Sequence, residues 1–311
     1  MNNTSSKSQS AGHFLQSILW ENFQKSRGKE IVHGSGKDFS FMATVERTPV
    51  GKYLLIPYGP YTASPSALPK ALDAIRAAAK SHGAIFARIE PTTRYTEAEM
   101  RHFGARKVKD VDPAETWVVD ISDTDNLKEV FPRRLRGYYN THADKDIEII
   151  VSHNPADIKH LVRLQAKTFK AKNITPYSET YLASELSQDF ATLYLAKYEH
   201  KIIAAILVFD DSTTRYYMQA ASDKDYAKLN ANGIITIQSM MDASKNGLKN
   251  YDFWGIAPDN APADHPWAGF TSFKKSFHGE EIHYSGTYDL PFDHFRYFLY
   301  KLLRKFKPPK R

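Results

Sequence analysis

The sequence predicts an α/β protein, in the broad sense that includes α+β, built from two similar units whose mixed, mostly antiparallel sheets are flanked by helices. Three observations support this prediction. The order strand, loop, helix, glycine, strand occurs twice. The length of 311 residues exceeds that of a usual single domain. A hydrophobic content of 42% is sufficient to bury a sizeable core.

The two copies of this order lie far apart in the chain. In the first copy, a strand (53–60) precedes a helix (66–83) and a buried strand (83–91). In the second copy, a strand (213–222) precedes a helix (229–247) and a strand that ends in proline (248–258). The helix ends AAAKSHG and DASKNG look alike, so we interpret the two segments as repeats of one α/β unit. Chance similarity is the alternative, because such helix ends are common.

The segment between the copies sets the expected domain boundary. A strand (117–122) is followed by the charged, aromatic run FPRRLRGYYN, which we expect to be helical, and then by the strand DIEIIVS. We therefore expect a first domain over residues 1–122 and a second domain that begins at residue 123.

The second unit continues with two helices and a strand meander. Asn154 and Pro155 are typical of a helix start, and a second helix follows from Glu179. Short polar breaks then divide residues 193–222 into three antiparallel strands. Two helices, a meander, a helix and a strand are the order of an acyltransferase of the GNAT type.

Composition excludes several kinds of chemistry. The chain has no cysteine, which excludes disulfides, zinc-thiolate sites and cysteine nucleophiles.

The start MNNTSSKSQSAG has no apolar core of a signal peptide and no long apolar run follows, so we expect a cytoplasmic protein. The formal charge of +7 favours polyanionic partners such as tRNA, nucleotide diphosphates or an anionic membrane face.

The C-terminal run FDHFRYFLYKLLRKF predicts a basic amphipathic helix that ends before Pro308. We interpret it first as a helix whose apolar stripe packs on a domain core and whose basic face is solvated. Peripheral contact with a membrane or RNA is the alternative.

The loops that would bind coenzyme A lack the expected glycines. GNAT acyltransferases hold the coenzyme pyrophosphate on backbone N–H groups of a glycine-rich loop before a helix. The corresponding segments here are DYAKLNANGIIT, with Gly233 alone, and GPYTASPSALP. We therefore expect no cofactor and a different acyl donor.

Nearly the whole chain resembles the FemABX family of non-ribosomal aminoacyltransferases. FLQSILWENFQKSRG is similar to the family's opening segment, LLIPYGP and RIEP resemble its first-domain strands, and NYDFWGIAP with HPWAGFTSFKKSFHG resembles its most specific pair of motifs. The resemblance implies tandem GNAT-like domains in a compact form without the family's helical arm. It also implies that the C-terminal segment 290–311 returns to the first domain, which leaves residues 123–289 as the second domain.

The implied activity is transfer of an amino acid from aminoacyl-tRNA to the stem-peptide amine of a peptidoglycan precursor. The acceptor is either UDP-MurNAc-pentapeptide or lipid II, and we expect a monomer. The basic terminal helix favours an acceptor at the inner membrane face.

The resemblance also implies site residues. The family's Phe-Lys step maps onto Phe273 and Lys274, where an ammonium would stabilise an oxyanion or hold the terminal phosphate of the tRNA, and the phenylalanine would shape the channel. By composition alone, Lys274 would be a surface lysine. We expect Lys275 to face solvent. Lys25 and Lys172 match basic residues that contact the precursor diphosphate, although Lys172 stands where arginine is usual.

Two tyrosines are further substrate-binding candidates by resemblance. Of the neighbours Tyr216 and Tyr217, only one can point toward the site, and we favour Tyr217. Tyr251 is the second candidate, and the alternative is a core tyrosine followed by a solvated Asp252. The histidine spacing predicts no metal site.

Two other functions stay open on the sequence. One is a GNAT-like N-acyltransferase that uses an acyl thioester donor on a sugar or polysaccharide. The other is a catalytically silent scaffold that binds tRNA or precursor.

Overall fold

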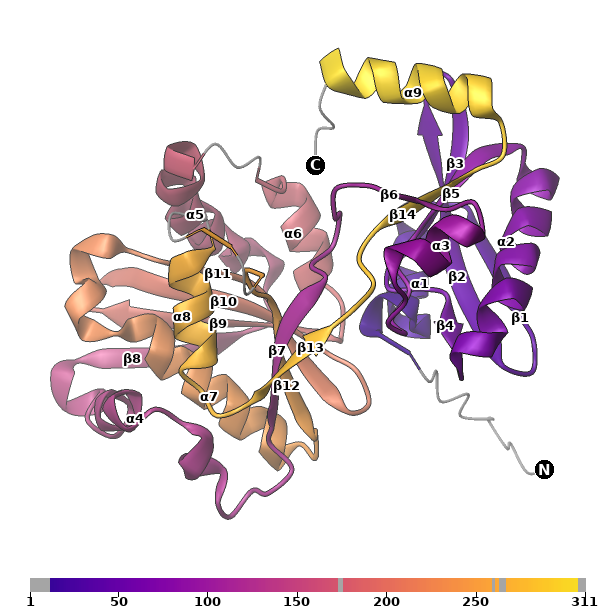
Figure 1. Ribbon diagram of the computed structural model, residues 1–311. Helices are drawn as coiled ribbons and strands as arrows, with labels where there is room; N and C mark the ends of the chain where they lie inside the picture. The colour runs from indigo at the N-terminus through magenta and orange to yellow at the C-terminus, as the bar shows by residue number, and fades with distance from the viewer. Residues whose placement is uncertain (1–11, 173–175, 259–260, 263–266, 307–311) are drawn as a thin grey trace, which may run out of the picture. The chain divides into compact units, whose positions relative to one another are not determined.

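The computed structural model describes residues 12–172, 176–258, 261–262 and 267–306 (Figure 1). Within this part of the chain there are two compact units. The first comprises the chain up to Ala114 together with the segment from His283 onward, and the second comprises Glu115–Ile282. No helix in the described stretches is long and apolar enough to cross a lipid bilayer.

The first unit is a mixed sheet in the strand order β1-β2-β3-β5-β14-β6, with β4 paired to β2. Its strands are antiparallel except for the parallel pair β3 and β5. Its elements are α1 (Ile18–Ser26), β1 (Ile31–Ser35), β2 (Phe39–Thr48), β3 (Gly51–Ile56), β4 (Tyr61–Thr62), α2 (Leu68–His82), β5 (Ala84–Ile89), α3 (Glu97–His102), β6 (Arg106–Lys107), β14 (Tyr288–Pro291) and α9 (His294–Phe306).

The helix α2 covers this sheet with an apolar stripe. Leu68, Leu72, Ile75 and Ala79 recur at helical spacing and are buried in one cluster with strand residues such as Leu54. Pro69 at its first turn and Gly83, with φ of 64°, at its end fix the helix boundaries.

The second unit is a sheet in the order β13-β7-β12-β11-β10-β9-β8, in which β11 and β12 are parallel. Its elements are β7 (Glu115–Asp120), α4 (Arg133–Asn140), β8 (Ile147–Ser152), α5 (Ile158–Lys172), α6 (Glu179–Leu186), β9 (Ala191–Tyr198), β10 (Lys201–Asp210), β11 (Thr214–Ser222), α7 (Ala231–Lys245), β12 (Asn250–Gly255), α8 (Ala268–Lys275) and β13 (Glu280–His283).

Alternating residues of β10 serve both faces of this sheet. Ala204, Ile206 and Val208 belong to the buried cluster that includes the apolar residues of α7. Phe209 points the other way and contacts Phe190, which follows α6, with ring centroids 5.0 Å apart. Between Lys201 and Asp210 at its ends, this strand is therefore continuously apolar, because helices cover both of its faces.

The unit boundaries differ from the expected 1–122 and 290–311. Strand β7 pairs with β12 in the second sheet, so the chain changes unit at Ala114 and not at residue 122. The return to the first unit begins at His283 because β14 pairs with both β5 and β6. Apolar patterning identifies a strand but does not say which sheet it joins.

A buried ion pair ties the C-terminal segment to the first sheet. Arg88 on β5 donates from Nε and Nη2 to the two carboxylate oxygens of Asp289 on β14, at 2.7 and 2.8 Å. The Tyr297 hydroxyl on α9 donates to the same carboxylate at 3.0 Å. Such a bidentate pair fixes both distance and orientation, and it therefore sets the register of β14.

Candidate functional site

The parallel strands β11 and β12 separate soon after they meet. The two strands form the pairs Thr214↔Asn250, Arg215↔Tyr251 and Tyr216↔Asp252. Beyond these, β11 continues to Ser222 and β12 to Gly255 without pairing with each other. We call the opening beyond Tyr216 and Asp252 the fork. A β-strand pair that parts within a sheet exposes backbone groups and side chains that a ladder would cover, which makes the fork the candidate site.

Each strand of the fork carries an irregularity where the two part. On β11, Met218 has no partner of its own, because Leu207 of β10 pairs with Gln219 and Val208 pairs with Tyr217. On β12, the register against β7 shifts between Asp252 and Gly255. Bulges of this kind bend a strand and are common beside active sites. They account for the separation of the two strands.

The bulge on β12 is centred on Trp254, whose φ of 61° is unusual for a bulky residue. Asp252 holds this conformation, because its carboxylate accepts the Trp254 backbone N–H at 2.7 Å and the Thr116 hydroxyl of β7. Asp252 is buried rather than solvated, contrary to the alternative that the sequence suggested. Burial raises its pKa to about 6, although the two hydrogen bonds oppose the rise.

Lys274 joins the two strands of the fork. From the last turn of α8, its Nζ donates to the Gly255 carbonyl of β12 at 2.5 Å and lies 6.0 Å from the ring centroid of Tyr217 on β11. Burial lowers the pKa of Lys274 to about 8, and the nearby charge of Asp252 partly offsets this. The site thus holds a desolvated ammonium that can both stabilise negative charge and release a proton close to neutral pH.

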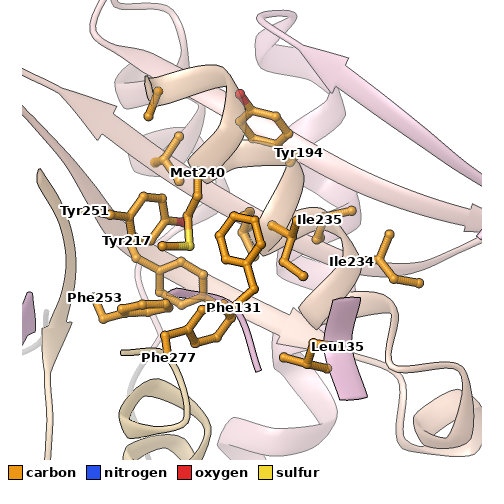
Figure 2. Packing of buried hydrophobic residues seen from close by; sticks show 14 of the residues in the cluster. Phe131, Leu135, Tyr194, Tyr217, Ile234, Ile235, Met240, Tyr251, Phe253 and Phe277 are labelled. Carbon is orange, nitrogen blue, oxygen red and sulfur yellow. The ribbon is translucent and has the colours of Figure 1, made fainter. Parts of the chain in front are cut away.

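An aromatic cluster supports the lysine, and Figure 2 shows Tyr217, Tyr251, Phe253 and Phe277 packed together. Phe273 of α8 packs edge-on against Phe253 and Phe277, with centroids 6.3 and 5.5 Å apart. These contacts fix α8, and with it Lys274, against β12.

The two candidate tyrosines differ in what their hydroxyl groups contact. The Tyr217 hydroxyl lies 3.0 Å from the Asn232 side-chain nitrogen, and burial raises its pKa to about 12. Tyr251 is fully enclosed, and its hydroxyl is 2.7 Å from that of Ser239 on α7. Tyr251 therefore belongs to the core beneath the fork. Of the two tyrosines, it is Tyr217 whose ring contacts the Lys274 ammonium.

The start of α7 has no glycine-rich loop in front of it. Residues 224–229 form a 3₁₀ helix, and Gly233 lies inside α7. A Cβ at Gly233 would be 2.7 Å from Cδ2 of Leu135, so this glycine permits α4 to pack closely on α7. The single glycine that matched the coenzyme-binding position thus has a packing role.

The remaining candidates do not belong to the two strands of the fork. Lys25 belongs to α1 of the first unit, is about half exposed and forms an ion pair with Glu21 at 2.6 Å. Lys172 ends α5, and its side chain lies outside the described residues. Lys275 is paired with Glu281 at 2.6 Å and is only partly exposed, so the expectation that it simply faces solvent is wrong.

The sequence did not single out Asp252, Thr116 or Asn232. A local signal for Asp252 was present, because an aspartate at a turn commonly accepts the backbone N–H of the residue two positions later. In the DFWG stretch, Asp252 accepts the N–H of Trp254 in this way. Thr116 is distant in sequence and no local pattern connects it to the fork. In the described residues, no group of three or more potential metal ligands comes together.

Fold and fork together define a protein with a tandem GNAT-like fold. The crystal structure of FemX matches with a TM-score of 0.75 at 17% identity, covering 94% of each chain. The C-terminal domain of a putative lysylphosphatidylglycerol synthetase from Agrobacterium fabrum matches at 0.58 with 13% identity, covering 93% of this chain and 92% of that one. A tandem GNAT protein from the clavulanic acid biosynthesis pathway matches at 0.52 with 10% identity, covering 85% and 83%.

The sequence profile of the FemAB family matches residues 143–305. This stretch is more than half of the chain and includes the whole fork with Lys274. The chain belongs to the FemAB family. No curated protein sequence matches it.

Proposed function

We propose that the protein is an aminoacyltransferase that moves an amino acid from aminoacyl-tRNA to the stem-peptide amine of a peptidoglycan precursor. The observation that carries this proposal is the desolvated Lys274 ammonium, which lies across the fork of a FemAB-family protein. In this proposal the reaction takes place in the cytoplasm and needs no cofactor.

The reaction requires little covalent help from the protein. The acceptor amine attacks the ester carbon, a C–N bond forms and the C–O bond to the tRNA ribose breaks. The amine loses one proton, and the leaving ribose oxygen gains one to become a hydroxyl. The ester is already activated, so positioning and charge stabilisation are the main tasks. Lys274 would stabilise the oxyanion of the tetrahedral intermediate or bind the terminal phosphate of the tRNA, and its pKa of about 8 would also suit proton donation to the leaving ribose oxygen.

Other residues have proposed roles in holding the substrates. Phe273 packs against Phe253 beside the lysine and would shape the channel for the acyl group. Tyr217 would contact the substrate at the β11 side of the fork. Lys25 and Lys172 would contact the precursor diphosphate, and the ion pair of Lys25 with Glu21 means that a diphosphate must compete with that carboxylate.

A second candidate function is N-acyl transfer from an acyl thioester to a sugar or polysaccharide. The tandem GNAT-like fold, which this chain shares with a protein of the clavulanic acid biosynthesis pathway, favours it. Against it, the position of the coenzyme cradle contains one glycine, which Leu135 packs upon. We therefore rank the aminoacyl-tRNA donor first.

The test is transfer of radiolabelled amino acids from a charged total tRNA pool to UDP-MurNAc-pentapeptide and to lipid II. Lys274→Ala should lower the rate about 10²- to 10³-fold, the usual effect of removing one group that stabilises an oxyanion. Lys275→Ala is the matched control, since it removes the neighbouring lysine and its pair with Glu281 but leaves the fork intact.

The outcome separates the candidates. Loss of transfer in Lys274→Ala with near-normal transfer in Lys275→Ala supports the proposed role. Equal activity of the two variants would remove Lys274 from the mechanism. No transfer to either acceptor by the intact protein, combined with binding of acetyl-CoA, would favour the thioester donor instead.

A further inference from the structure

The C-terminal helix α9 is attached to the first unit through its tyrosines. Tyr297 and Tyr300 are buried, with exposed fractions of 1% and 6%, and their ring centroids lie 5.2 and 4.8 Å from that of Phe86 on β5. Tyr300 also lies 6.1 Å from Tyr53. With the Tyr297 hydroxyl bonded to Asp289, these contacts determine which face of α9 is turned inward.

The opposite face of α9 is apolar and exposed. Phe295, Phe298, Leu302 and Leu303 have exposed fractions of 71%, 62%, 42% and 45%. Their spacing of three, four and one residues places them on one side of the helix. The sequence-based interpretation that the apolar stripe packs on the core was therefore wrong, because the tyrosines occupy the inward face. We call these four residues the α9 stripe.

Such a surface needs an explanation. Single exposed apolar residues are ordinary, but a contiguous apolar patch on a helix is typical of a surface that meets another molecule or a membrane. Of the nine large apolar residues that are exposed in the described part of the chain, four belong to this one helix.

The charges around the α9 stripe indicate what kind of partner it has. Helix α9 carries Arg296, Lys301 and Arg304 and has no acidic residue. Arg304 donates to the Tyr300 hydroxyl at 2.8 Å on the inward side, whereas Arg296 and Lys301 are exposed. Asp293, which precedes the helix, forms an exposed pair with Arg296 at 3.6 Å, and Asp289 is buried on the inward side, where it accepts from Tyr297. An excess of positive charge beside an apolar stripe is complementary to an anionic surface.

We propose that α9 binds an anionic lipid bilayer, lying in the plane of the interface with the α9 stripe inserted and its basic residues at the headgroups. The helix has 13 residues and is about 20 Å long, which suits an interfacial position and is too short to span the hydrocarbon core. A second copy of the chain fits less well, because facing α9 helices would bring like charges together. The inference does not depend on which substrates the transferase uses.

The first test is co-sedimentation of the protein with vesicles of phosphatidylglycerol and phosphatidylcholine, compared with phosphatidylcholine alone. The intact protein should bind the anionic vesicles, and Phe295→Ser/Phe298→Ser should bind more than tenfold more weakly, because two exposed rings that insert are lost. Lys301→Gln should lower binding about fivefold, and only to anionic vesicles. Val151→Ser is the matched control, since Val151 is a 47% exposed apolar residue on β8 of the other unit.

The second test uses the absence of cysteine from the chain. Phe298→Cys can be labelled at one position with an environment-sensitive dye, and Val151→Cys provides the control label. Anionic vesicles should raise and blue-shift the emission of the first label and leave the second unchanged.

Several results would overturn the proposal. Intact protein that stays in the supernatant with anionic vesicles would do so, as would equal binding by Phe295→Ser/Phe298→Ser. Concentration-dependent dimerisation that is abolished by the same double substitution, without vesicle binding, would assign the α9 stripe to a second copy. Because all the altered side chains are exposed, unchanged circular dichroism should accompany each variant, and transfer to a soluble acceptor is a separate readout of the proposed function.

Discussion

The two units contain the same strand-helix-strand arrangement, but the two parallel strands stay paired to their ends in the first unit and separate in the second. In the first unit, β3 and β5 pair as far as Ile56↔Ile89, where both strands end. In the second unit, β11 and β12 part after Tyr216↔Asp252, and β11 extends six residues further. The strands of the first pair stay together to their ends, whereas those of the second are apart over the last six of the nine residues of β11 and the last three of the six residues of β12.

The closing contacts of the first unit are polar and lie just beyond the strands. Glu90 follows β5, and its carboxylate accepts the backbone N–H of Tyr58 and of Asp112 and the hydroxyl of Thr287. The equivalent place in the second unit holds Trp254, Gly255 and the Lys274 ammonium. In the same α/β unit, hydrogen bonds can hold the ends of the parallel strands together, or bulges can bend them apart and open a candidate site.

The closed unit should be the more sensitive to loss of a buried charge. Arg88→Ala leaves the Asp289 carboxylate buried without its partner, and it should lower the free energy of unfolding by about 3–5 kcal/mol. Urea unfolding measures the change, and amide exchange should show the loss of protection in β5 and β14 and not in β11. Arg101→Ala is the control, because its pair with Glu97 is exposed and should contribute less than about 1 kcal/mol. Similar effects of the two substitutions would contradict the special role of the buried pair.

The open unit should be sensitive to crowding at the start of α7. Gly233→Ala places a methyl group against Leu135 and should cost about 1–3 kcal/mol of stability. With Leu135→Ala present, the Gly233→Ala step should become stabilising by up to about 1 kcal/mol, because alanine is the better helix former, and a double-mutant cycle in urea detects the difference. A full cost of Gly233→Ala in both backgrounds would mean that backbone conformation, and not Leu135, requires the glycine.

The fork should also give the protein a characteristic pH dependence. If transfer needs the Lys274 ammonium, the rate should fall about tenfold per pH unit above about pH 8, after correction for spontaneous ester hydrolysis. Lys274→Arg keeps its charge and should lose this basic limb, whatever its absolute rate. An unchanged limb in Lys274→Arg would assign the limb to another group.

The same lysine should appear in stability measurements with a defined sign. Its pKa is lower in the folded protein, about 8, than the ordinary value of 10.5, so the unfolded chain binds more protons between these values. The contribution of Lys274 to the free energy of unfolding should therefore rise as pH increases through that window. The free energies of unfolding of the native chain and of Lys274→Ala, measured between pH 8 and pH 10, give this contribution as their difference.

The sequence predicted the repeated unit because its signals are local. Helical composition, Gly83 and a following apolar strand are all visible in short windows, and the structure places α2 and β5 there. Lys274 could be singled out by the resemblance to a family but not by composition, because two adjacent lysines look like a surface pair. Burial of its ammonium depends on a bulge in β12 and on rings from several elements.

The features that sequence reasoning missed are those that need distant partners. The buried state of Asp252 depends on Thr116, which lies 136 positions earlier. The orientation of α9 depends on Phe86, whose ring packs against the rings of Tyr297 and Tyr300. Periodicity correctly identified an apolar stripe on α9, but both faces of that helix carry large rings, and only the tertiary contacts decide between them.

The position of β14 has a consequence for how the chain is assembled during synthesis. Strand β14 lies between β5 and β6, so the first sheet lacks an interior strand until residues near Pro291 have left the ribosome. The second unit is continuous in sequence from Glu115 to Ile282 and can complete its ladders earlier. The first sheet is therefore the last to be completed, and a released chain truncated before Tyr288 should contain a native second unit and an incomplete first one.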